Sequence, residues 1–181
     1  QLAAWGIKKI PTTDLAWVTA DTEHFELPAH YALVVAGGAP HRPAKRWPSA
    51  CYSELVTALA ADGYTPVLIG DTAEAGTLHD IASAIPQTKN LCGRTNLADI
   101  VALARSAVVT VGNDTGPTHL AAAAGCPTVV LFSSESNPAL TAPRGPHVEV
   151  LCTPTLANLR VDAVVATMQR TLRVQAPTEQ P

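Results

Sequence analysis

Short apolar runs rich in β-branched residues alternate with amphipathic stretches along the 181 residues of this chain. The runs are typical of strands buried on both faces, and the stretches are typical of helices with one apolar side. The predicted strands cover residues 31–36, 65–70, 90–93, 107–111, 128–132 and 147–151. The predicted helices lie between Pro48 and Gly63, from Asp71 or Thr72 through Ile85, from Thr95 or Asn96 through Ala104 with Leu97 on the buried side, from Pro117 to Gly125, and over residues 161–172. This alternation predicts an α/β fold, a Rossmann-like three-layer parallel sheet with helices on both faces.

The two ends of the chain lack this periodicity. Residues 1–29 predict a linker, in which residues 2–6 fit the end of a helix and Trp5 and Trp17 are interpreted as packing anchors. Residues 30–174 carry the whole pattern of strands and helices, and residues 175–181 predict a frayed tail. We therefore expect one domain, long enough to bury a core. Because the chain starts with glutamine rather than methionine, we expect a fragment of a longer protein.

Residues 107–125 organise the rest of the chain. A buried strand leads into a polar turn from Gly112 to Gly116, which is predicted to need unusual backbone angles. An alanine-rich helix follows from Pro117 and stops at Gly125. This succession places free backbone N–H groups at the carboxyl end of a strand, where open α/β sheets bind phosphate.

Two polar side chains of this turn each fit two interpretations. Asp114 precedes a helix whose first turn contains proline, so it fits a helix cap as well as a ligand contact. His119 lies in the first helical turn, where a protonated imidazole would oppose the helix dipole. It therefore fits a neutral packing histidine or a histidine that faces a bound anion.

Basic side chains gather before the N-terminus of a predicted helix, where positive charge is electrostatically unfavourable. Arg42, Lys45 and Arg46 precede the helix that begins near Pro48, and cations at a helix N-terminus cost roughly 0.3–1 kcal/mol each without compensation. A solvated basic turn is one explanation. An anion held between this turn and the Asp114 turn explains the placement better.

Glu74 follows the second predicted strand and also has two interpretations. It stands three residues after Asp71, the spacing of a capping box at the start of a helix. An acidic residue just past the carboxyl end of a strand can instead accept hydrogen bonds from ribose hydroxyls, as in dinucleotide-binding folds.

Composition narrows the classes of partner. The formal net charge of −3 gives no bulk electrostatic support for a nucleic-acid partner. The four cysteines form no C-x-x-C pair, which favours reduced, buried thiols in a cytosolic compartment. No apolar run approaches the ~20 residues of a membrane helix, and neither a signal peptide nor a metal-ligand cluster is expected.

Residues 114–123, followed by Gly125-Cys126-Pro127, resemble the signature of glycosyltransferase family 9, the ADP-heptose:lipopolysaccharide heptosyltransferases. The resemblance extends through residues 43–48 and 70–74 and covers roughly residues 30–145. The order matches the C-terminal, donor-binding lobe of the two-lobed GT-B fold. It implies that residues 1–29 connect the lobes, and that this chain alone is an inactive fragment without the acceptor lobe.

The resemblance also implies the chemistry of the site. The resemblance implies that Lys45 contacts the donor diphosphate and that Glu74 binds the ribose. Gly38, Asp114, Thr115, Gly116 and His119 are expected to complete the diphosphate and sugar site. The implied donor is an ADP-sugar, expected to be ADP-heptose, used without a metal or another cofactor. The general base and the lipid-linked or oligosaccharide acceptor belong to the N-terminal lobe. The implied location is cytoplasmic, at the inner face of the inner membrane, with peripheral membrane contact only for the full-length protein.

The loop of residues 133–138 departs from the family pattern, which usually has a glycine soon after the phenylalanine and a threonine before the proline. Its hydroxyls and free amides fit a sugar or phosphate contact, or a polar surface loop. The identity of the sugar therefore stays open. Two other hypotheses are a GT-B enzyme that uses a UDP-sugar and a non-catalytic nucleotide-binding module.

Overall fold

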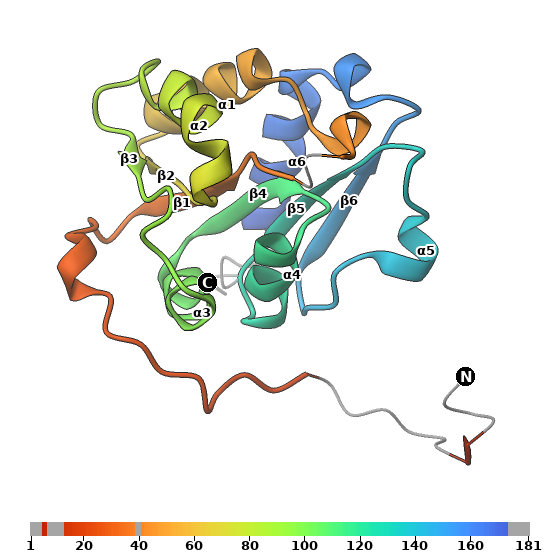
Figure 1. The fold of residues 1–181 in the computed structure, drawn as a ribbon, viewed down its shortest axis with the longest axis horizontal. Coiled ribbons are helices and arrows are strands. Elements are labelled where there is room, and N and C mark those ends of the chain that lie inside the picture. The colour runs from red at the N-terminus through yellow and green to blue at the C-terminus, as the bar shows by residue number, and fades with distance from the viewer. Residues whose placement is uncertain (1–4, 7–12, 39–40, 174–181) are drawn as a thin grey trace, which may run out of the picture.

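The computed structural model describes residues 5–6, 13–38 and 41–173, and Figure 1 shows their arrangement. Within these residues, six strands form one parallel sheet in the order β3-β2-β1-β4-β5-β6. The strands are β1 (Tyr31–Val35), β2 (Thr65–Leu68), β3 (Lys89–Asn90), β4 (Val109–Asn113), β5 (Thr128–Phe132) and β6 (Val148–Cys152). The helices are α1 (Ser49–Ala61), α2 (Ala75–Ala82), α3 (Leu97–Ser106), α4 (Gly116–Ala123), α5 (Pro138–Thr141) and α6 (Val161–Arg173). The predicted α/β, Rossmann-like fold is confirmed.

Helices cover both faces of the sheet. One face carries α1, α2 and α6, whose apolar side chains share a buried cluster with alternate residues of the strands. The other face carries α3 and α4, packed over a second cluster that includes Leu33, Val67 and Ile100. The strands β1, β4 and β5 are buried on both sides along their whole length, which is why they read as continuous apolar runs.

The strand order reverses between β1 and β4. From β1 the chain moves outward through β2 to β3, then crosses to β4 and moves outward the other way. The carboxyl ends of β1 and β4 therefore diverge into loops that turn to opposite sides, and the crevice between such loops is where open α/β sheets bind ligands.

The boundaries of the central turn differ from the prediction. Gly112 and Asn113 belong to strand β4, and neither Gly112 nor Gly116 has a positive φ, so the predicted unusual backbone angles are wrong. Gly112 is required for space instead. A Cβ there would lie 2.6 Å from Thr118 Oγ1 and 2.7 Å from the Cβ of Val35.

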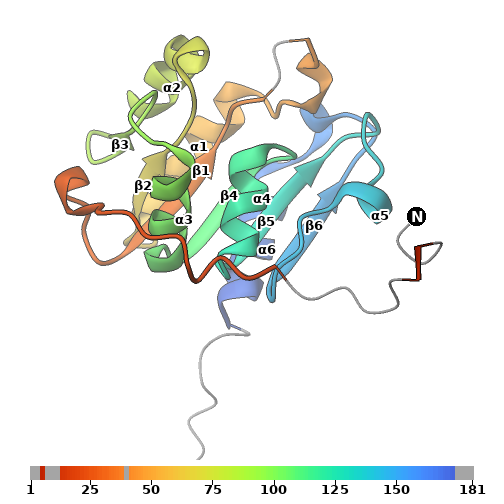
Figure 2. The ribbon, with the colours of Figure 1, turned by 60° about the horizontal axis from the view of Figure 1, so that its bottom comes forward.

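Residues 13–18 run along the outer side of α3 and α4, the helices that cover the second face of the sheet (Figure 2). The Arg105 guanidinium of α3 donates hydrogen bonds to the carbonyls of Leu15 and Val18, at 2.7 Å for Val18. Trp5 and Trp17 are 83% and 78% exposed, so their interpretation as packing anchors is wrong. The predicted helix end at residues 2–6 and the tail at 175–181 fall largely or wholly outside the described residues.

The structure also bears on the cysteines and on membrane-spanning helices, for which the composition gave expectations. All four cysteines are free, but only Cys126 is buried and Cys152 is exposed, so the expectation of buried thiols holds for one residue. Within the described ranges, no helix has both the length and the apolar character needed to cross a membrane.

Candidate nucleotide-sugar site

A cavity of about 470 Å³ opens at the carboxyl ends of β1 and β2, beside the start of α4. Its wall comes from loops far apart in the sequence: the β1 loop, the β2–α2 loop, the segment after β3 and the first turn of α4. The cavity is lined by Val35, Gly37, Gly38, Ile69, Gly70, Asp71, Thr72, Glu74, Gly93, Thr95, Leu97, Ile100, Thr115 and Pro117. The cavity lies at the reversal of the strand order, where a ligand is expected.

Glu74 closes the polar end of this cavity. Its carboxylate accepts hydrogen bonds from the Gly38 N–H at 2.6 Å and from the Asp71 N–H at 3.0 Å. Asp71 in turn accepts from the Ala73 N–H, so the capping box predicted from the sequence is confirmed. Each carboxylate oxygen keeps further lone-pair capacity. The ribose role of Glu74 is thus compatible with its capping role and stays a prediction.

Two glycines make room for the Glu74 carboxylate. A Cβ at Gly37 would overlap its oxygens, and a Cβ at Gly70 would lie 2.5 Å from Oε2. Gly37 and Gly70 each lie two residues past the end of a strand, β1 and β2 respectively. The carboxylate therefore sits directly against the backbone at the ends of two neighbouring strands.

The other end of the cavity is apolar and suits a planar base. Ile69, Ile100 and Pro117 line it, together with Leu97, which is 68% exposed. The sequence placed Leu97 on the buried side of its helix, and this prediction is wrong. Asn96 caps α3 through a reciprocal hydrogen-bond pair with Asp99, which leaves Leu97 as the first helical residue at the rim of the cavity.

A second polar group joins the basic turn to the start of α4. Lys45 Nζ lies 2.7 Å from Asp114 Oδ2, and His119 Nε2 lies 3.0 Å from Asp114 Oδ1. The side chains of Lys45 and Asp114 are 15% and 8% exposed, whereas that of His119 is 39% exposed. The cap of α4 is Thr115, without a side-chain cap bond, so the interpretation of Asp114 as a helix cap is wrong.

The Asp114 carboxylate is held ionised by its neighbours. Burial alone would raise its pKa, but hydrogen bonds from Lys45, His119 and Ser136, together with the charge of Lys45, bring the pKa below its ordinary value. Ser136 belongs to the loop after β5 that departs from the family pattern. That loop therefore reaches the polar group rather than forming a purely solvent-facing turn.

This lowered pKa predicts a pH-dependent contribution to stability. The folded state favours the ionised carboxylate, so its contribution is present above the ordinary aspartate pKa of about 3.9 and is lost as the pH falls through the lower folded value. Asp114→Asn should therefore flatten the acid limb of the unfolding free energy measured by urea denaturation. The exposed Asp80 provides the control variant, Asp80→Asn. Equal acid limbs for Asp114→Asn and wild type would contradict the assignment.

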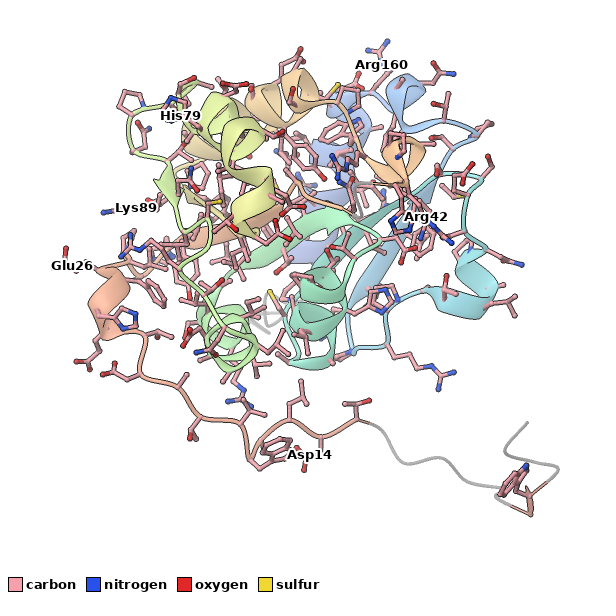
Figure 3. All side chains as sticks on the ribbon, in the orientation of Figure 1. Asp14, Glu26, Arg42, His79, Lys89 and Arg160 are labelled. Atoms are coloured by element: carbon pink, nitrogen blue, oxygen red, sulfur yellow. The ribbon has the colours of Figure 1, made fainter. Side chains whose placement is uncertain are left out.

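The three basic residues of the turn have different surroundings. Lys45 pairs with Asp114, and the Arg46 guanidinium donates to the Gly38 carbonyl. Arg42 is exposed and lies on the loop between β1 and α1, where Figure 3 labels it. The solvated-turn explanation therefore fits Arg42 alone. A Cβ at Gly38 would lie 3.3 Å from Arg46 and 3.7 Å from Thr115, the residues that directly follow Lys45 and Asp114, so Gly38 lies between the cavity and the two segments that carry the polar group.

The first turn of α4 offers backbone donors beside this group. Gly116 and Thr118 occupy the first helical positions, where an N–H has no partner further back in the helix, and Pro117 between them has none to offer. These donors and the positive end of the helix dipole favour an anion. The sequence-predicted residues are thus brought together in two adjoining groups, one around Glu74 and one around Lys45.

These groups can contact a ligand that combines an apolar ring, hydroxyls and an anionic group, and a nucleoside diphosphate is one such ligand. The cavity provides apolar surface for a base and a carboxylate for ribose hydroxyls, and the adjoining group provides a lysine, a histidine and free N–H donors for phosphate oxygens. In the part of the chain that the structure describes, no three His, Cys, Asp or Glu side chains are grouped as a metal site.

Residues 7–165 match the sequence profile of glycosyltransferase family 9 (heptosyltransferase), and the chain belongs to this family. It is 36% identical over 111 residues to lipooligosaccharide heptosyltransferase 2 of Haemophilus influenzae and 35% identical over 119 residues to lipopolysaccharide heptosyltransferase 2 of Salmonella typhimurium. The alignments cover 59% and 63% of this chain but 32% and 34% of those proteins. The chain thus spans about a third of the length of these curated relatives.

Solved structures show the same relationship. ADP-heptose lipopolysaccharide heptosyltransferase II of E. coli superposes with a TM-score of 0.76 at 27% identity, over 92% of this chain and 53% of that one. The E. coli heptosyltransferase WaaC with ADP superposes with a TM-score of 0.72 at 26% identity, over 82% of this chain and 48% of that one. These similarities confirm the family resemblance inferred from the sequence motifs.

Proposed function

We propose that this chain is the donor-binding lobe of a heptosyltransferase that uses ADP-heptose in the synthesis of lipopolysaccharide or a related surface glycan. The observation that carries the proposal is the junction at Gly38, where the Glu74 cavity adjoins the Lys45–Asp114–His119 group. Two solved relatives support an adenine nucleotide, since one contains ADP and another ADP-2-deoxy-2-fluoro heptose. The chain covers about half of each, as one lobe of a two-lobed enzyme would.

In this proposal the nucleoside occupies the cavity, with its ribose hydroxyls donating to Glu74 and its base between Ile69 and Leu97. The diphosphate then extends past Gly38 to Lys45 and the first N–H groups of α4. Thr115 lines the cavity and directly follows Asp114, so it lies where the two halves of the ligand join. Asp114 would orient Lys45 and His119 or accept a hydroxyl of the sugar.

Transfer of the sugar requires stabilisation of the leaving nucleoside diphosphate. Negative charge develops on the β-phosphate as the glycosidic bond breaks, and preorganised donors lower the energy of that charge. Lys45, the N–H groups of Gly116 and Thr118, and His119 provide such donors without a metal. Asp114 holds the Lys45 ammonium close to the start of α4 before any phosphate binds.

The remaining functions are assigned to the other half of the protein. The acceptor surface and the general base would lie in an N-terminal lobe, with residues 1–29 connecting the two lobes and 30–174 forming the donor lobe. We place the enzyme at the cytoplasmic face of the inner membrane, where a lipid-linked acceptor is presented.

A nucleotide panel tests the proposal on this chain directly. Thermal unfolding is followed with ADP, UDP and GDP, each at the same high concentration. Binding at about 100 times Kd stabilises the folded state by about 2.7 kcal/mol, and we expect ADP to give the largest shift in Tm. A larger shift with UDP would favour a UDP-sugar enzyme. No shift with any nucleotide would refute the donor lobe, and a longer protein that binds ADP but transfers no sugar would indicate a non-catalytic module.

A further inference from the structure

Asn113 is a fully buried amide at the junction of the candidate site. It is the last residue of β4, and its side chain is 0% exposed. Its Nδ2 donates to the carbonyls of Ala36 and Gly37 at 2.9 and 3.0 Å. Its Oδ1 accepts from the Trp47 N–H at 3.1 Å and from the Tyr52 hydroxyl at 2.9 Å. These four bonds use the two donors and two lone pairs of the amide.

The position of Asn113 explains why an amide is needed there. Strand β1 ends at Val35, opposite Gly112, so the next two carbonyls of the chain lie past the end of the β1–β4 ladder. Past the end of the ladder, the side-chain N–H groups of Asn113 donate to these two carbonyls in place of backbone N–H groups. They hold the Ala36-Gly37 backbone against β4, and Gly37 is the residue on which the Glu74 carboxylate rests.

The acceptor side of Asn113 fixes the basic turn. Trp47 follows Lys45 by two residues, its ring is 2% exposed, and its Nε1 donates to the Leu159 carbonyl. Asn113 therefore binds the backbone two residues after Lys45, while Asp114, its neighbour in the sequence, binds the Lys45 ammonium. The side-chain bond of Lys45 must be shared or exchanged when phosphate enters, but the Asn113 bond lies beneath the turn and is buried.

We propose that Asn113 is a positioning residue for the donor diphosphate, a role that rests on the proposed donor site. Its buried amide joins the β1 loop to the backbone of the Lys45 turn, and its backbone carbonyl accepts a hydrogen bond from Thr118 Oγ1 in the first turn of α4. Its loss falls mainly on the alignment of Lys45 with the α4 N–H groups, because the Glu74 carboxylate at the nucleoside end keeps the Asp71 N–H bond of its own capping box. Recognition sites tolerate displacements of only about 0.5 Å, so loss of this amide weakens phosphate binding in particular.

The test compares ADP with adenosine, because a general loss of stability affects both ligands alike. Calorimetric titration of Asn113→Ala should show the ADP affinity falling about tenfold, the effect of one misaligned charge-assisted hydrogen bond, with adenosine changed less than about twofold. Val111→Ala is the matched control: it creates a cavity at another fully buried residue of β4 and should keep the ratio of the two affinities. In a Lys45→Ala background, Asn113→Ala should change the ADP affinity less than about twofold.

A milder variant covers the case in which Asn113→Ala does not fold. Tyr52→Phe keeps the buried ring and removes one donor to Asn113, and it should lower the ADP-to-adenosine affinity ratio about two- to fivefold. An unchanged ratio in the folded variants, with wild type binding ADP in a Lys45-dependent way, overturns the role of Asn113 alone. Wild type that binds neither ligand overturns the proposed function instead.

Discussion

Lys45→Ala is expected to weaken ADP binding by about 1.5–3 kcal/mol, or about 10- to 150-fold, and to leave adenosine binding nearly unchanged. The loss corresponds to one charge-assisted hydrogen bond between the ammonium and a phosphate oxygen. The unfolding free energy of the ligand-free protein should also fall, because the Asp114 carboxylate, 8% exposed, loses the lysine ammonium that lies 2.7 Å from it. Calorimetric titration and denaturant unfolding measure the two effects separately.

Arg42→Ala is the matched control for Lys45→Ala. Arg42 lies three residues earlier on the same turn and carries the same charge, but it is exposed and outside the polar group. It should change ADP affinity by no more than the weak, salt-dependent effect of a surface charge. Equal losses of ADP affinity for the two variants would show that the turn acts through general electrostatic attraction and would contradict the specific role of Lys45.

Gly37→Ala is expected to weaken adenosine and ADP binding together, by roughly tenfold or more. A Cβ at Gly37 would occupy the place of the Glu74 carboxylate, so Glu74 must swing away from Gly38 and Asp71. The nucleoside end of the site then loses its ribose acceptor, in contrast to Lys45→Ala, which affects the diphosphate end. Loss of the capping bonds should lower stability by about 1 kcal/mol.

Gly76→Ala provides the control for this substitution. Gly76 lies in α2, close to Glu74 in the sequence, and a Cβ there would meet nothing within 4 Å. The replacement should raise stability by roughly 0.5–1 kcal/mol, since alanine favours the helix, and should leave both ligands' affinities unchanged. If Gly37→Ala retained wild-type adenosine affinity, Glu74 would not be the ribose acceptor.

The sequence was sufficient for the architecture because burial on both faces leaves a continuous signal. Strands β1, β4 and β5 are buried along their whole length and consist mainly of apolar residues, and α1, α2, α3 and α6 each bury residues at helical spacing. Local side-chain chemistry was equally readable. The capping box at Asp71–Glu74 forms as its spacing predicts, since it depends on neighbours within one turn.

The features that the sequence left open depend on contacts between distant residues. By its local sequence Asp114 fits a helix cap, yet it pairs with Lys45, 69 residues away. The reversal of the strand order between β1 and β4 brings the loops after these two strands together. Asn113 looked like part of a glycine turn, and its role emerges only from the carbonyls past the end of β1 and the Trp47 backbone. Leu97 has an apolar side chain at helical spacing, and its position at the very start of α3 is what turns it to the cavity rim.

Titration of the isotope-labelled chain with ADP, followed by amide resonances, tests the central claim most directly. We predict saturable shifts at Gly37 and Gly38, at 72–74, at 95–97, and at 115, 116, 118 and 119, which together trace the cavity and the adjoining polar group. Residues 157–162, which line a separate hollow beside α1 and α6, should not respond and serve as the internal reference. Saturating ADP that leaves the first set unchanged, or that shifts only residues 157–162, would contradict the assignment of this site to a nucleoside diphosphate.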